Sequence, residues 1–159
     1  MLVIPEFWRS EIWHPLTVHF PIVLLIIAPL LYIVSLIIRR QAWTEVSYVL
    51  LWLGTLGAWI AVYTGNIADS VVSREICDPM VLETHETNAY IVAGIFSGAS
   101  VLAFINRLRF WSKWFHIGLV TLLLVGSGFL AYTGHLGAQL VYQQGAGVYH
   151  PTDDCSEFE

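Results

Sequence analysis

Four long runs of apolar residues dominate the chain, and short polar stretches separate them. The runs cover 16–38, 46–64, 87–105 and 114–133. A helix that crosses a bilayer needs about 20 predominantly apolar residues, and each run reaches or approaches that length. Lipid offers no water to bond an open sheet edge, so helices are the expected structure. The pattern predicts an all-α membrane protein with four transmembrane helices in one domain, residues 1–159.

The basic residues predict how these helices are oriented. Five of the seven lysines and arginines lie in the two short connections, after the first and third runs: Arg39, Arg40, Arg107, Arg109 and Lys113. Short loops rich in Lys and Arg stay in the cytoplasm. Both termini, the loop 65–86 and a tail at 134–159 are therefore expected on the outer side. Short connections make neighbouring helices antiparallel, which predicts an up-down-up-down bundle.

Composition supports the membrane assignment and excludes several functions. The chain is 57% hydrophobic and only 12% charged, whereas soluble domains carry about 25% charged residues. No Lys/Arg patch suggests nucleic-acid binding, and no phosphate-binding loop or catalytic triad is apparent. We therefore expect no nucleic-acid partner, and an electron-transfer protein or complex subunit rather than an independent enzyme. The first residues have neither the basic start nor the cleavage site of a signal peptide.

Two cysteines suggest a disulfide. Cys77 lies in the predicted outer loop and Cys155 in the predicted outer tail. Disulfides persist outside the cytoplasm, and an isolated pair there favours one bridge between tail and loop. Two unpaired thiols, or a bridge to another subunit, are the alternatives. The chain has no CxxCH motif, so covalent c-type haem attachment is not expected.

Histidines gather at the predicted outer side. Five of the six lie there: His14, His19, His85, His135 and His150. An ionisable residue within a membrane span is costly, and it marks a functional site by default. His19 qualifies best, because it lies inside the first run close to Pro21, whose ring removes one backbone hydrogen bond. His85 opens the third run, and the first and third helices of a square bundle face each other diagonally.

Two imidazoles from facing helices bind a haem iron from both sides. His19 and His85 are the predicted first axial pair of a non-covalent b-type haem, and His14 with His135 is a reserve pair for a second haem. His116 on the inner side and His150 in the outer tail are expected to be ordinary surface residues. Further residues are expected to orient His85 or to line the pocket or a quinone cleft: Glu83, Glu86, Tyr90, Tyr132 and Trp13.

Several motifs resemble one known family. HPLTVHFPI occupies 14–22, Thr64-Gly65 closes the second run, His85 opens the third, and a glycine-rich exit at 134–137 leads into Leu140-Val141-Tyr142. This pattern resembles a large bacterial family of predicted inner-membrane proteins whose domain has no assigned function. The resemblance covers nearly the whole chain. It implies four spans in the bacterial inner membrane, with both termini periplasmic, and supplies no activity.

Electron transfer is the function expected from these features. The chain is similar, at fold level only, to small four-helix b-type cytochromes. It would pass electrons between quinol, or a membrane complex, and an outer carrier docked by the acidic outer side. One alternative is a non-haem site for zinc, copper or iron, held by three or four of the outer histidines, with His19 and His85 among them, and by Glu83 or Glu86. Another is a cofactor-free accessory subunit of a respiratory or photosynthetic complex, in which the histidines only hydrogen-bond.

Overall fold

Four long helices make up the protein. The computed structural model describes residues 9–108 and 112–148. A short 3-10 helix, η1 (Ser10–Ile12), leads into α1 (Trp13–Ile38), α2 (Gln41–Val72), α3 (Pro79–Arg107) and α4 (Lys113–Gln144). Each of the four is long and apolar enough to cross a membrane. No strand occurs within the described residues, so the predicted all-α fold class is confirmed.

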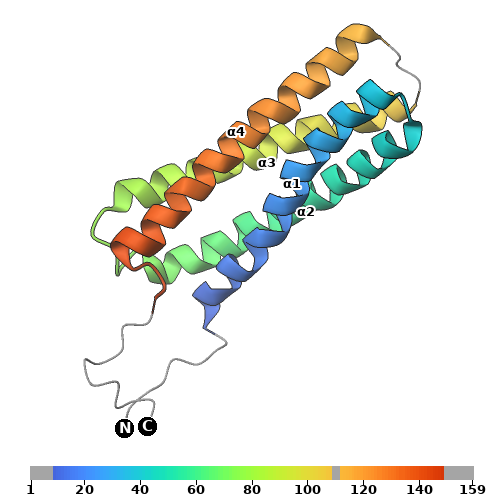
Figure 1. Cartoon of the computed structure of the whole chain (residues 1–159). Helices are drawn as coiled ribbons and strands as arrows, with labels where there is room; N and C mark the ends of the chain where they lie inside the picture. The colour runs from blue at the N-terminus through green and yellow to red at the C-terminus, as the bar shows by residue number, and fades with distance from the viewer. Residues whose placement is uncertain (1–8, 109–111, 149–159) are drawn as a thin grey trace.

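The helices form two antiparallel hairpins, α1–α2 and α3–α4, which pack side by side (Figure 1). The turns within the hairpins lie at one end, which we call the inner end. The α2–α3 connection lies at the other end with the start of α1 and the end of α4, and we call this the outer end. The names follow the predicted orientation. Helices α1 and α3 are diagonal, which confirms the up-down-up-down arrangement.

The helices extend beyond the predicted runs, mostly at the outer end. The expected loop 65–86 shrinks to residues 73–78, and the expected tail from 134 is helical to Gln144. The helices are longer than the apolar runs because hydropathy marks only where lipid contact ends. The helical backbone hydrogen bonds continue through the polar residues that follow. Local signals stop the helices instead. Asp78 caps α3 by accepting from Met80 N at 3.0 Å, and Gly145 ends α4 with φ +68°.

Close helix approach builds the core, and lipid-facing apolar residues surround it. A Cβ atom at Gly54 would lie 2.7 Å from the Leu25 side chain, and one at Gly126 would lie 3.0 Å from the Phe96 ring. Small residues allow membrane helices to pack this closely. Many large apolar side chains are exposed instead, such as Phe20 at 61%. The bundle therefore holds its own core and leaves an apolar outer surface for the bilayer.

Candidate functional site

His14 lies in the first turn of α1, half-buried at the outer end. Its Nδ1 atom lies 3.0 Å from the carbonyl oxygen of Ala61 on α2. The hydroxyl of Thr64 is 3.5 Å from the same nitrogen, and Thr17 and Thr64 hydroxyls bond at 2.9 Å. A carbonyl only accepts, so Nδ1 donates its proton there. In the neutral ring this leaves the lone pair on Nε2 free.

His85 repeats this arrangement on the other hairpin. It lies in the second turn of α3 and is also half-buried. Its Nδ1 atom lies 3.0 Å from the carbonyl oxygen of Thr133 on α4. The same reasoning puts the proton on Nδ1 and the free lone pair on Nε2. Each histidine is thus held by a backbone carbonyl of its hairpin partner helix.

The two rings meet inside the bundle from diagonal helices. The ring centres of His14 and His85 are 6.1 Å apart, and the ring planes are inclined by 84°. Two imidazoles that bind one ion from opposite sides, with bonds of about 2 Å, place their ring centres roughly 6 Å apart. The observed separation of the ring centres is therefore compatible with a ligand shared between the two rings.

A glycine on the neighbouring helix lies against each histidine ring. Gly65 on α2 faces His14, and Gly137 on α4 faces His85. A Cβ atom would lie 3.1 Å from Cε1 of His14 in the first case and 3.2 Å from Cε1 of His85 in the second. Each glycine follows the carbonyl partner of its histidine by one helical turn. The two hairpins therefore contribute equivalent half-sites.

His19 does not join this pair. It is exposed on α1, and its Nδ1 atom lies 2.6 Å from the carbonyl oxygen of Pro15 in the same helix. Five residues separate His19 from His14, which places them about 140° apart around the helix. In this structure His14, and not His19, is the α1 histidine whose ring meets His85. Pro21 is buried, and its ring would lie 3.2 Å from a Cβ at Gly57.

His135 does not complete a second pair either, because it is exposed on α4 while His14 faces His85. The predicted orienting role of Glu83 and Glu86 is taken by the Thr133 carbonyl. Glu83 is exposed, and Glu86 lies 3.2 Å from the amide of Asn66 when that amide is turned. The residues predicted to line the pocket are 42–49% exposed: Trp13, Tyr90 and Tyr132.

The structure also bears on the predicted non-haem metal site and on the two cysteines. Within 9–108 and 112–148, no three His, Cys, Asp or Glu side chains converge on a point that would hold a metal ion. Cys155 and His150 lie outside the described residues, so the disulfide and the surface role of His150 stay predictions. Cys77 is exposed between α2 and α3.

The model of a family described as a predicted membrane protein (DUF2231) matches residues 12–150. The chain belongs to the DUF2231 family. The match includes all four helices and both halves of the histidine pair, which confirms the resemblance to a membrane family without an assigned function. No curated protein and no solved structure matches the chain. Four spanning helices and this family together make it a multi-pass membrane protein.

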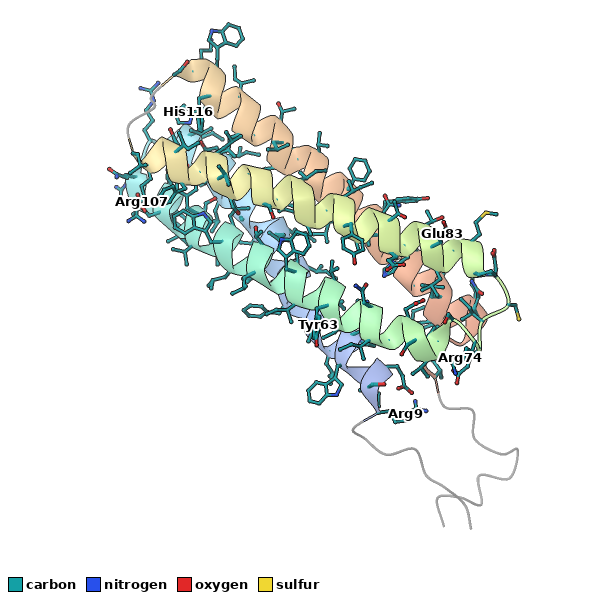
Figure 2. The ribbon with its side chains drawn as sticks, turned by 180° about the vertical axis from the view of Figure 1, so that it is seen from behind. Arg9, Tyr63, Arg74, Glu83, Arg107 and His116 are labelled. Atoms are coloured by element: carbon teal, nitrogen blue, oxygen red, sulfur yellow. The ribbon has the colours of Figure 1, made fainter. Side chains whose placement is uncertain are left out.

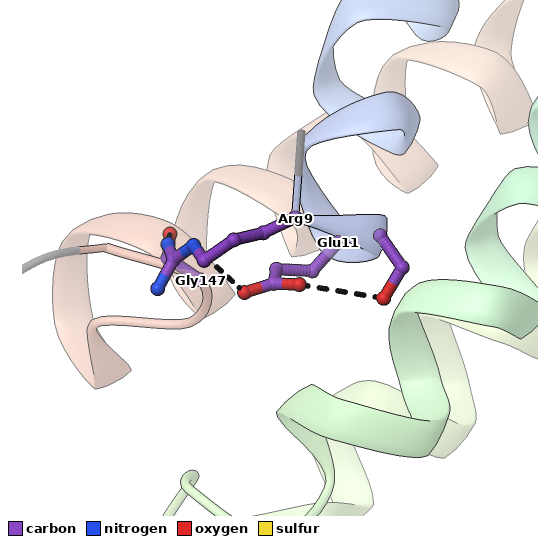
Figure 3. A network of polar contacts seen from close by, with 4 residues as sticks. Arg9, Glu11 and Gly147 are labelled. Atoms are coloured by element: carbon purple, nitrogen blue, oxygen red, sulfur yellow. Dashed lines mark hydrogen bonds and ion pairs between the residues drawn. The ribbon is translucent and has the colours of Figure 1, made fainter. Parts of the chain in front are cut away.

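The DUF2231 chain also has a polar network at the outer end that its sequence did not reveal. Glu11 in η1 is buried, and its carboxylate lies 3.1 Å from Nε of Arg9 as an ion pair (Figure 3). Arg9 Nη2 donates to the Gly147 carbonyl at 3.3 Å. This links the segment before α1 to the segment after α4, one helical turn from His14. The sequence feature that pointed to this network was an acidic residue, Glu11, shortly before the first apolar run.

A second missed cluster lies at the inner end of the DUF2231 bundle. His116 on α4 is half-buried, and its Nδ1 atom lies 2.8 Å from the Tyr32 hydroxyl. The Tyr32 ring stacks on Tyr48 with centres 5.7 Å apart, and Asn106 donates to the Tyr48 hydroxyl at 2.6 Å. His116 is therefore part of a buried network, not an ordinary surface residue. Tyr32 lies in the middle of an apolar run, where sequence alone gave no indication of a polar partner.

Proposed function

We propose that this DUF2231 protein binds one b-type haem between His14 and His85 and transfers electrons through it. One observation carries the proposal: two half-buried imidazoles approach each other from diagonal helices, with ring centres 6.1 Å apart. Histidine pairs of this kind hold haem iron in membrane bundles. The proposal changes the predicted axial pair from His19 and His85, and it reduces the expected haem number to one.

The hydrogen bonds of both rings support ligation. A metal-binding histidine almost always donates its other ring N–H to a carboxylate, carbonyl or water, which fixes the ring and raises its basicity. His14 and His85 both make this bond, to Ala61 and Thr133. Their Nε2 atoms are then available as ligands.

Ligand number favours haem over a bare metal ion. Zinc takes four ligands, of which at least three come from the protein. The described residues bring together only two imidazoles, and no third metal-binding side chain converges with them. Haem supplies four equatorial nitrogens of its own and requires only two axial ligands. The histidine pair meets that requirement, which leaves the zinc, copper and iron alternatives less well supported.

The position of the pair suits electron transfer across one membrane surface. Haem supplies one-electron chemistry, and this chain holds the group near the outer end, close to an aqueous phase. The donor we propose is a quinol in the bilayer or a neighbouring membrane complex. The acceptor we propose is a soluble carrier, which acidic residues exposed at this end, such as Glu75 and Glu83, would attract if it is basic.

A visible spectrum and a quinol addition test the two parts of this proposal separately. Protein purified from cells supplied with haem is reduced with dithionite, and the air-oxidised spectrum is subtracted. We expect a sharp b-type α-band. A folded protein with no such band would overturn haem binding and favour the cofactor-free subunit. Anaerobic addition of a water-soluble quinol should then develop the same band. An intact haem that no quinol reduces would contradict direct quinol oxidation alone.

A further inference from the structure

The inner end of the bundle carries a basic crevice that the proposed haem site does not involve. Two adjoining cavities of about 690 and 570 Å³ open there, and both are lined by Leu36, Arg39 and His116. We call the cationic residues that line them the inner basic crevice: Arg39, Arg40, Arg107 and Lys113. Figure 2 shows Arg107 and His116 together at this end, opposite Arg9, Arg74 and Glu83.

Most of this positive charge is uncompensated. Arg107 pairs with Glu45 at 3.4 Å and also lies 6.0 Å from the Trp52 ring centre. Within the described part of the chain, Arg39, Arg40 and Lys113 form no ion pair and no side-chain hydrogen bond. Like charges that repel one another next to a low-dielectric membrane attract an anion strongly.

Two helices begin at the same crevice. The α2 helix starts after Arg40 and α4 starts after Ser112, and neither cap residue bonds a first-turn N–H through its side chain. Unsatisfied N–H groups and the helix dipole favour negative charge at a helix N-terminus. The side chains of Gln41 and Lys113, from the first turns of α2 and α4, line the two cavities. The helix ends therefore add to the attraction that the side chains exert.

The backbone at Arg39 is an independent sign of function. Arg39 ends α1 in the left-handed region, with φ 52° and ψ 38°, and it is the sole non-glycine residue with positive φ in the described segments. Glycine usually occupies this position because it avoids the steric cost. Non-glycine residues in this region persist where the surrounding structure fixes them, and they cluster at ligand sites and switch regions. Arg39 lines both cavities, so its guanidinium is the feature that glycine would lose.

An apolar wall rises from the basic crevice toward the bilayer. Leu36, Ile117 and Val120 line the larger cavity, and Leu36 and Ile117 are 37% and 45% exposed. The larger cavity lies where α1 meets α4, the most sparsely packed pair of adjacent helices. A ligand that fits has a phosphate group at the crevice and a hydrocarbon chain along this wall.

We propose that the inner basic crevice binds one anionic phospholipid. Arg39 and Lys113 hold its phosphate, and one acyl chain lies along Leu36, Ile117 and Val120. Basic pockets between membrane helices bind anionic headgroups in this way. The charge, the helix ends, the Arg39 backbone and the apolar wall all support the same ligand class. The proposal is independent of haem.

Native mass spectrometry of the full chain in detergent tests it, with phosphatidylglycerol and phosphatidylcholine titrated in parallel. We expect one phosphatidylglycerol to remain bound per chain, in preference to phosphatidylcholine. Each basic residue near an anionic surface contributes roughly fivefold in affinity, so Arg39→Gly and Lys113→Ala should each weaken binding about fivefold. Arg39→Gly removes the backbone strain, so its fold should be kept. Arg74→Ala, at the outer end, is the matched control.

Any of three results would overturn the proposal. Equal retention of both lipids, or full binding by Arg39→Gly and Lys113→Ala, would remove the basic crevice as the site. The third result concerns whether the bound phosphate group belongs to a lipid or to a soluble ion. If millimolar inorganic phosphate displaces phosphatidylglycerol completely, the crevice is a site for a soluble phosphate and not for a lipid.

Discussion

At the scale of single residues, the candidate site depends on which imidazole nitrogen is free. Backbone carbonyls of Ala61 and Thr133 occupy Nδ1 of His14 and His85. Neither carbonyl can rotate away without disturbing its helix, so both rings keep the same tautomer and orientation. Such preorganisation is what a second shell of hydrogen bonds contributes to a ligated histidine.

Gly137 provides a residue-scale prediction. In Gly137→Ala the new methyl would lie 3.2 Å from Cε1 of His85, so the ring must tilt and the proposed axial bond weakens. We expect lower haem content or a shifted α-band. Gly134→Ala is the matched control on the same helix, because nothing lies within 4 Å of its Cβ. Replacing helical Gly by Ala there should stabilise the fold by roughly 0.5–1 kcal/mol. Identical spectra for both variants would contradict the packing argument.

The sequence alone indicates the histidines, but it does not indicate that His14 is the α1 histidine whose ring meets His85. The choice of His19 over His14 rested on depth within the apolar run. Depth is a property of hydropathy, whereas facing direction depends on rotation about the helix axis, which neighbouring helices set. Pro21 approaches Gly57 closely across the α1–α2 interface, since a Cβ at Gly57 would lie 3.2 Å from the Pro21 ring. Such a contact between distant residues is not visible in one sequence.

At the scale of elements, hydrophobic runs located all four helices, and their ends came from other chemistry. The Asp78 cap and Pro79 start α3 well before its apolar run, and Gly145 stops α4 well after its own. These signals are readable from sequence. The membrane criterion alone does not use them at the outer end, because it gives no reason for a helix to continue into water.

Close packing within the first hairpin yields an element-scale prediction. A Cβ at Gly54 would lie 2.7 Å from two atoms of Leu25, a buried core residue. Gly54→Ala should therefore overpack the α1–α2 interface and destabilise the fold by about 1–3 kcal/mol. Gly94→Ala on α3 is the comparison, since no atom lies within 4 Å of its Cβ. Thermal unfolding in one detergent measures both. Equal midpoints would show that α1 adjusts freely.

At the scale of the whole molecule, the predicted orientation assigns different chemistry to the two ends. The histidine pair lies at the outer end, near the starts of α1 and α3, and the inner basic crevice lies at the other end, where Figure 2 shows Arg107 and His116. Two hairpins with equivalent half-sites, each a histidine and a glycine, generate the pair by packing side by side. The helices can be predicted from hydropathy. Which two histidines meet depends on how the hairpins pack, so it follows only from the three-dimensional structure.

Thiol labelling tests this orientation. A membrane-impermeant maleimide added to intact spheroplasts should label Cys77, which is exposed at the outer end. If the predicted bridge to Cys155 exists, labelling should require prior reduction. Ser112→Cys, in a background that also carries Cys77→Ala and Cys155→Ala, places the single thiol at the inner end and should react only after lysis. Labelling with the opposite dependence on lysis would invert the topology.

The most direct test of the central claim is the haem-to-protein ratio of four single variants, measured by pyridine haemochrome and amino-acid analysis. His14→Ala and His85→Ala remove the two imidazoles that face each other, while His19→Ala and His135→Ala remove exposed ones. We predict one haem per chain in the unmodified protein and in the two exposed variants, and loss of haem in the other two. Haem retained in folded His14→Ala and lost in His19→Ala would contradict the proposed site.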